Sequence, residues 1–158
     1  MRHVFFSFHY QRDIWRANVV RNSGAVMGEA AAGFRDASLW EEAKKKGDAA
    51  IKALINEGLK GTTVTAVLIG AQTSNRRYVD YEIEKSIERG NGLLGLRIHN
   101  IKDQSGNTDS LGLIPSRLSG GGYPSYTWST CEDFAKWVED AYNAAQAKLA
   151  KKSSTSWW

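Results

Sequence analysis

The sequence lacks the features that mark several common classes of protein. Its 158 residues include one cysteine, Cys131, which excludes a disulfide framework within the chain and indicates a reducing compartment. No apolar run approaches the ~20 residues that a membrane-spanning helix requires. The short apolar run at the N-terminus, residues 4–8, is not followed by the small residues of a signal-peptide cleavage site. We therefore expect a cytoplasmic protein that does not enter the membrane.

The net charge of the chain is also small. Lys and Arg number 21 against 17 Asp and Glu, which gives a net charge of +4 at neutral pH. The basic residues are interspersed with acids, as in residues 41–46, and such mixed runs usually form a solvated helix face. A mild, dispersed positive charge favours an anionic small molecule as ligand and argues against nucleic acid as a partner.

Sequence patterns for phosphate cradles and metal sites are missing. No GxxxxGK[ST] is present, and no GxGxxG follows a predicted strand. Residues 9–12 differ from the Ser/Thr/Gly-rich phosphate loop of a flavodoxin, and residues 69–71 lack the Asp of a phosphoacceptor receiver. The three histidines and Cys131 do not have the spacing of metal ligands. We expect neither a metal ion nor a bound cofactor.

The pattern that is present alternates strands with helices. Nearly continuous apolar runs at 4–8, 64–70 and 93–98 predict strands buried on both faces, as in a parallel sheet. Amphipathic helices are predicted over 48–59 and 77–89. This order predicts an α/β fold, a flavodoxin-like, doubly wound parallel sheet flanked by helices. We expect a single domain over residues 1–150, followed by a tail over 151–158.

Local signals add detail to this fold. Ligands of doubly wound sheets bind outside the carboxyl ends of the strands, so the loops that follow the strands should border one crevice. The local predictions are a short second strand within 30–34, a loop over 34–40, N-caps at Asp48 and at Ser74 or Asn75, a buried stripe of Val79, Ile83 and Ile87, a long irregular segment over 99–128, and a capping box of Thr130 and Asp133.

A carboxylate is the main reactive group that the pattern offers to this crevice. Glu82 lies at one edge of the apolar stripe of the helix over 77–89, and we expect it to be half buried at the crevice end. Tyr78, one turn earlier, lies on the same side. Glu84 flanks the other edge of the stripe equally well. The periodicity alone leaves open whether Glu82 is functional or a solvated helix acid.

Three motifs follow one another along the chain. Residues 4–8, VFFSF, form an aromatic-Ser-aromatic strand with Asp13 shortly after it, and residues 34–36, FRD, precede Gly47. Residues 78–82, YVDYE, stand at the start of a helix. In this order they resemble the motifs of the TIR domain family, with Tyr and Val in place of the usual Trp and Cys of the third motif. Four further stretches resemble the TIR-like, ThsB-type proteins of the bacterial Thoeris antiviral defence system, namely residues 15–22, 38–42, 67–73 and 90–99.

The resemblance implies a function. Enzymes of this kind cleave NAD at the nicotinamide–ribose bond, and ThsB-type proteins do so on infection to make a cyclic ADP-ribose-type signal that activates a partner effector. Glu82 takes the position of the catalytic glutamate. A single carboxylate suits this chemistry, because it stabilises an oxocarbenium-like ribose and the nicotinamide leaves without a general acid. NAD is then the substrate, and self-assembly or a phage-derived trigger is expected to control activity.

The resemblance also implies a substrate-binding set around Glu82. Aromatic side chains are expected to stack on nicotinamide or adenine, and basic ones to meet the pyrophosphate. The predicted set comprises Phe8, Trp40 and Tyr78 as stacking residues, His9, Arg12 and Arg35 at the pyrophosphate, and Phe34 and Asp36 from the second motif.

Two functions of other classes stay open on the sequence. The chain can be a non-catalytic TIR-like or receiver-like module that binds a partner through helix faces and the Trp157-Trp158 tail. It can also be an enzyme similar to a deoxyribosyltransferase, which would use a single glutamate to act on nucleosides. Full activity of a Glu82→Ala variant would favour the first alternative, and turnover of free nucleosides in preference to NAD would favour the second.

Overall fold

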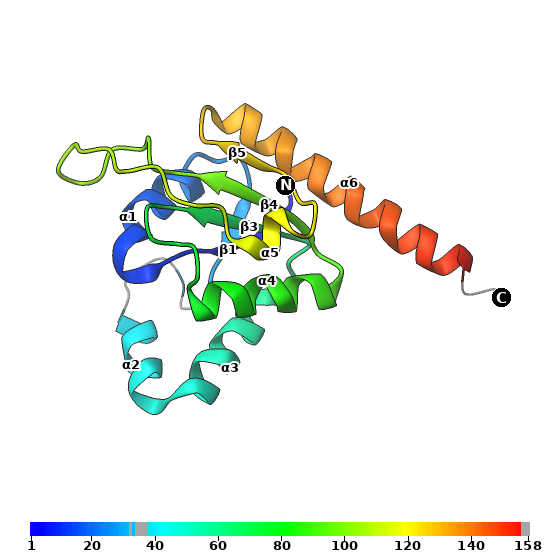
Figure 1. Cartoon of the computed structure of the whole chain (residues 1–158), viewed down its shortest axis with the longest axis horizontal. Helices are drawn as coiled ribbons and strands as arrows, with labels where there is room; N and C mark the ends of the chain where they lie inside the picture. Colours follow the sequence, from blue (N-terminus) through cyan, green and yellow to red (C-terminus); the bar gives the residue numbers. More distant parts are fainter. Residues whose placement is uncertain (32, 34–37, 156–158) are drawn as a thin grey trace.

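A single parallel sheet forms the centre of the molecule (Figure 1). The computed structural model describes residues 1–31, 33 and 38–155. Within this part of the chain, five strands pair in parallel in the order β2-β1-β3-β4-β5, the order of a flavodoxin-like, doubly wound fold. The strands are β1 (His3–Ser7), β2 (Met27–Glu29), β3 (Val64–Ile69), β4 (Gly92–Arg97) and β5 (Ser125–Thr127).

Helices cover both faces of the sheet, as a parallel sheet requires. Phe5 and Phe6 point to opposite faces: the Phe6 ring contacts Phe134 of α6, and the Phe5 ring lies against Gly58 of α3. In Figure 1, α6 crosses one face and projects beyond the sheet, while α4 lies across the other face. The helices are α1 (Tyr10–Arg21), α2 (Ser38–Lys46), α3 (Asp48–Leu59), α4 (Arg77–Arg89), α5 (Ser116–Ser119) and α6 (Cys131–Thr155).

The central strands explain the stability of the sheet. All six residues of β3 are buried, as are the first five residues of β4, and these strands pair along their whole length. The predicted α/β fold and the strands at 4–8, 64–70 and 93–98 are therefore confirmed. The bounds predicted for α4 match the structure, and Gly90 ends this helix in the left-handed conformation, with φ 80°.

The second strand lies earlier than the sequence analysis placed it. We predicted it within 30–34, whereas β2 spans Met27–Glu29 and pairs with the start of β1. Its side chains are largely exposed, because it forms an edge of the sheet. Main-chain pairing with β1 therefore defines this strand, and no apolar pattern could reveal it. Residues 38–40 were assigned to a loop but form the first turn of α2.

The C-terminal third is more regular than predicted. The irregular segment expected over 99–128 contains α5 and β5, and β5 pairs with β4 from Gly95 to Arg97. One half of the capping box predicted for α6 is confirmed, since the backbone N–H of Asp133 donates to the hydroxyl of Thr130 at 3.1 Å. The Asp133 carboxylate accepts a hydrogen bond of 2.7 Å from Ser129 Oγ. This helix runs to Thr155, past the boundary that we drew at residue 150. Trp157 and Trp158 lie outside the described residues.

Three local predictions about helix ends and faces were wrong. Asp48 is the first residue of α3 rather than its N-cap, and its carboxylate binds side chains of α4 instead. The N-cap of α4 is Arg76, not Ser74 or Asn75. Ile87 was placed in the buried stripe of α4 but is 45% exposed, because it lies in the last turn of the helix, where it borders a cavity.

The described part of the chain contains no helix that is long and apolar enough to cross a membrane. Cys131, at the start of α6, is a free thiol.

Candidate active site

The candidate site lies where the strand order reverses. Chain connections run from β1 outward to β2 on one side and from β3 to β4 on the other. The carboxyl ends of β1 and β3 therefore flank a topological switch point, which is where doubly wound sheets bind ligands. Ser7 ends β1, Gly70 follows β3, and α4 begins seven residues beyond Gly70.

Glu82 is buried at this point. Its side chain is 1% exposed, and Ser7 Oγ donates a hydrogen bond of 2.8 Å to its Oε1. No described residue bonds to its Oε2. Glu82 was expected to be half buried, but it falls on the buried face of α4 with Val79 and Ile83. Glu84 is exposed, with Arg117 at 3.9 Å, so the two acids that periodicity could not separate have different environments.

Burial controls the charge of Glu82. Desolvation raises the pKa of its carboxyl well above the ordinary range, and the hydrogen bond from Ser7 opposes this in part. Burial therefore favours the protonated form of this carboxyl. A positively charged ligand group nearby would favour the carboxylate, and a carboxylate in a dry site stabilises developing positive charge strongly.

A second buried carboxyl lies at the same edge of the sheet. Asp13, in the first turns of α1, is fully buried, and no described residue bonds to either oxygen. It packs directly against Gly70, where an added Cβ would lie 2.3 Å from Oδ2. Burial raises its pKa to about 6, although Arg12 and Arg16 act in the opposite direction. Residue 70 must therefore be glycine for Asp13 to occupy this position.

Four aromatic rings contact one another in series near the first turns of α1 and α4. The rings of Phe8 and Tyr10 stack at 4.3 Å, and those of Tyr10 and Trp40 at 4.7 Å with an interplanar angle of 8°. The edge of Tyr78 meets Trp40 at 5.6 Å. Both faces of Tyr10 are thus covered by aromatic neighbours. Because Phe8, Tyr10 and Trp40 are buried, they pack on one another here and form the inner wall of a pocket.

That pocket opens between the first turns of α1 and α4 and the helix α2. It has a volume of about 230 Å³. The hydroxyl of Tyr78 donates to Asp48 Oδ1 at 2.9 Å, which ties α4 to α3 on one side of the pocket. Burial, Arg76, Arg12 and Lys44 together lower the pKa of His9, so its imidazole is neutral at pH 7. The lining residues are Phe8, His9, Tyr10, Gln11, Trp40, Lys44, Arg76, Arg77, Tyr78 and Val79.

Comparison with known proteins gives this geometry its context. Residues 5–103 match the family described as Thoeris protein ThsB, TIR-like domain. A protein of Bacillus cereus (strain MSX-D12), named "Putative cyclic ADP-D-ribose synthase ThsB1", is 50% identical over 147 residues, which cover 87% of this chain and 74% of that protein. The chain belongs to the ThsB TIR-like family. The family match runs from β1 to just past β4, so it includes Ser7, Asp13 and Glu82.

The structure brings only part of the predicted set together. Phe8, His9, Trp40 and Tyr78 line the pocket, and Glu82 lies behind its wall, one helical turn after Tyr78. Arg12 does not line it; its guanidinium binds Asp109 at 2.8 Å. Phe34, Arg35 and Asp36 lie outside the described residues.

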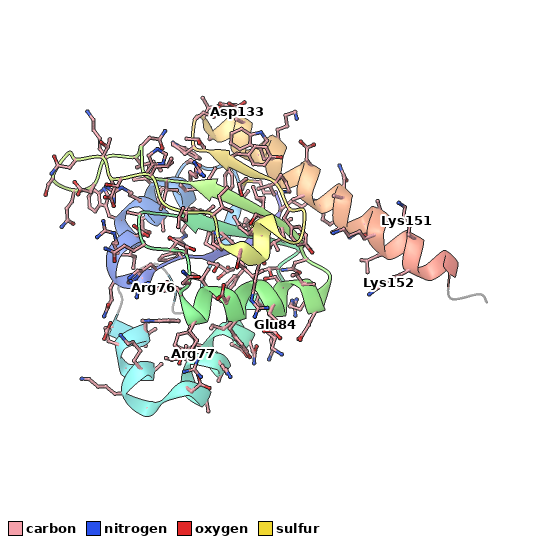
Figure 2. All side chains as sticks on the ribbon, viewed as in Figure 1. Arg76, Arg77, Glu84, Asp133, Lys151 and Lys152 are labelled. Atoms are coloured by element: carbon pink, nitrogen blue, oxygen red, sulfur yellow. The ribbon has the colours of Figure 1, made fainter. Side chains whose placement is uncertain are left out.

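Several residues of this region were not in the predicted set. Ser7 was part of a quoted motif, and its place at the end of a strand was a usable signal for a contact to the site. Tyr10 carried no signal, because its role depends on two rings from other elements. Lys44 looked like one more charge on a solvated helix face. Arg76 is the N-cap of α4 and lies near the start of that helix in Figure 2.

No grouping of three or more His, Cys, Asp or Glu side chains that could hold a metal ion occurs among the residues that the structure describes. The two buried acids at this edge have different neighbours. Glu82 faces Ser7, whereas Asp13 faces Gly70 and the arginines of α1. The arrangement suits electrostatic stabilisation by one carboxylate.

Proposed function

We propose that this protein cleaves NAD at the nicotinamide–ribose bond and closes the remaining ADP-ribose into a cyclic product. The buried Glu82, held by Ser7 behind an aromatic pocket, is the observation that carries the proposal. The family and the name of the Bacillus cereus relative support it. The product would act in the cytoplasm as an anti-phage signal for a partner effector, with infection as the trigger.

The proposed chemistry starts from the positive charge of the substrate. NAD carries a pyridinium ring, so its approach favours ionisation of Glu82, and the displaced proton leaves to solvent. The C1′–N bond then breaks with its electron pair passing to nicotinamide, which departs neutral. The carboxylate stabilises the oxocarbenium-like ribose that remains.

Ring closure requires that water be kept from this cation. A nucleophilic atom of the same ADP-ribose attacks C1′, and its proton passes to the Glu82 carboxylate. Attack by water would give linear ADP-ribose instead. The near-complete burial of Glu82 supports closure, because a site that excludes water prevents hydrolysis of a reactive intermediate. Because Glu82 is 1% exposed and does not line the pocket, the proposal requires a local movement that lets the ribose reach it.

The test is mass spectrometry of the products that purified, concentrated protein forms from NAD. We expect nicotinamide and an ADP-ribose species from the native protein and a loss of at least about 100-fold in Glu82→Gln. Glu84→Gln is the matched control, since it changes an exposed acid of the same helix and should leave the rate unchanged. Retention time against linear ADP-ribose separates a cyclase from a hydrolase.

Two results with NAD and one with free nucleosides would contradict the proposal. One is equal nicotinamide release by native protein and Glu82→Gln. The other is no release by either protein, both alone and in lysate of infected cells, which would favour a binding module. Preferential turnover of free nucleosides would favour a deoxyribosyltransferase-like enzyme.

A further inference from the structure

Cationic side chains surround the mouth of the candidate pocket. Lys44 comes from α2, and Arg76 and Arg77 stand at the start of α4. None of the lining residues, all of which the structure describes, is acidic. Figure 2 shows both arginines near the beginning of α4, with Arg77 on the side of α2 and α3. The lining of the pocket therefore carries a net positive charge, and Glu82 is buried nearby.

The two arginines differ in what they already bind. Arg77 Nη2 lies 2.9 Å from Asp48 Oδ1, so its charge is compensated by a carboxylate. Arg76 donates to neutral acceptors on Gln72, with Nε 3.0 Å from the backbone oxygen and Nη2 3.3 Å from Oε1. Within the described chain, no carboxylate lies at ion-pair distance from Arg76. Its charge is thus available to a ligand.

Lys44 and His9 complete the same mouth. Lys44 is 3.9 Å from Glu41, a loose pair on the exposed side of α2. Burial contributes most to lowering the pKa of the His9 imidazole, and the charges of Arg76, Arg12 and Lys44 contribute next. These cations therefore lie around one small region. A neutral imidazole donates one hydrogen bond without adding charge.

The backbone supports the same ligand chemistry. Both α1 and α4 begin at this pocket, after the N-caps His9 and Arg76. Neither of these two described side chains forms a capping hydrogen bond to its helix. First-turn N–H groups without a capping partner favour an anionic acceptor.

We propose that Arg76 and Lys44 bind the diphosphate of a dinucleotide substrate, with His9 of the same pocket as an additional donor. The proposal rests on the proposed function and names the part of NAD that this mouth holds. Tyr78 and Val79 line the same pocket and precede Glu82 by about one helical turn, roughly 5 Å. A diphosphate at the mouth therefore directs the adjoining ribose toward Glu82.

The test compares affinities for ADP-ribose, adenosine and inorganic pyrophosphate by isothermal titration calorimetry. The variant is the double substitution Lys44→Ala/Arg76→Ala. The control is Lys45→Ala/Arg89→Ala, which removes the same charges from exposed positions on the same two helices. We expect the variant to bind ADP-ribose about 10- to 100-fold more weakly and adenosine unchanged. Its KM for NAD should rise by a similar factor with little change in kcat.

Each outcome decides a separate point. ADP-ribose affinity that is equal in the native protein and the variant would overturn the diphosphate site, even if NAD is cleaved. Pyrophosphate that binds as tightly as ADP-ribose would assign the site to a free anion and overturn the dinucleotide assignment. ADP-ribose binding that depends on Arg76, in a protein that releases no nicotinamide, would support the site while contradicting the proposed function.

Discussion

The two ends of the central strands differ in whether their buried polar groups have hydrogen-bond partners. At the amino ends of β3 and β4, Asn91 Nδ2 donates to the hydroxyls of Thr62 and Thr65 at 3.1 and 3.2 Å, and Thr65 and Ser86 share a hydrogen bond of 2.6 Å. Ser86 in turn donates to the backbone oxygen of Glu82 at 2.7 Å. This network satisfies itself without a ligand.

At the carboxyl ends, by contrast, several buried polar atoms of the described chain lack hydrogen-bond partners. Both oxygens of Asp13 and one oxygen of Glu82 are buried without a hydrogen-bond partner among the described residues. Buried polar groups are normally paired, and exceptions concentrate at functional sites because unpaired groups destabilise the fold. The difference indicates that the amino end serves stability and that the carboxyl end is arranged for chemistry.

The largest effect expected on stability is at Asp13. Its pKa of about 6 in the folded protein is above the ordinary aspartate value of 3.8. Between these values the folded state binds more protons than the unfolded one, so this group lowers stability as pH rises through about 4 to 6. Relative to the native protein, Asp13→Asn should therefore gain up to about 3 kcal/mol in free energy of unfolding between pH 4 and pH 7.

Urea denaturation of both proteins across this pH range measures the gain. The difference between the two proteins, rather than either curve alone, isolates Asp13, because Glu82 and His9 titrate in both. A difference that stays constant from pH 4 to pH 7 would show that Asp13 is ionised in the folded protein.

A smaller effect is expected at the amino end. Asn91→Ala removes the donor that joins Thr62 and Thr65. Because buried hydroxyls lose a partner, we expect a cost of about 2 kcal/mol that does not depend on pH between 4 and 7. Nicotinamide release per folded molecule should be unchanged. Lower activity at equal folded fraction would show that this network also shapes the site, and the contrast between the two ends would fail.

The sequence allowed us to predict those features of the fold and the site that depend on local residue patterns. The bounds of α4 followed from its apolar spacing and from Gly90. The choice between Glu82 and Glu84 came from the resemblance to the TIR motif and not from periodicity, because both flank the same stripe. In the structure Ser7, 75 residues away on another element, distinguishes them. The unpaired state of Asp13 was equally invisible, since it arises from packing against Gly70. Long-range contacts of this kind have no periodic signature.

The smallest expected change in stability, with the most specific readout, is at Ser7. Ser7→Ala removes the hydrogen bond to Glu82 and should cost about 1 kcal/mol. Because that bond lowers the pKa of Glu82, its loss raises the pKa further. If Glu82 acts as a carboxylate, the acidic limb of the pH–activity profile must then move to higher pH.

Thr65→Val is the matched control, because it removes a buried hydroxyl at the opposite end of the sheet. It should reduce stability without moving the profile. A profile that shifts equally in both variants, or in neither, would mean that Ser7 does not set the charge of Glu82.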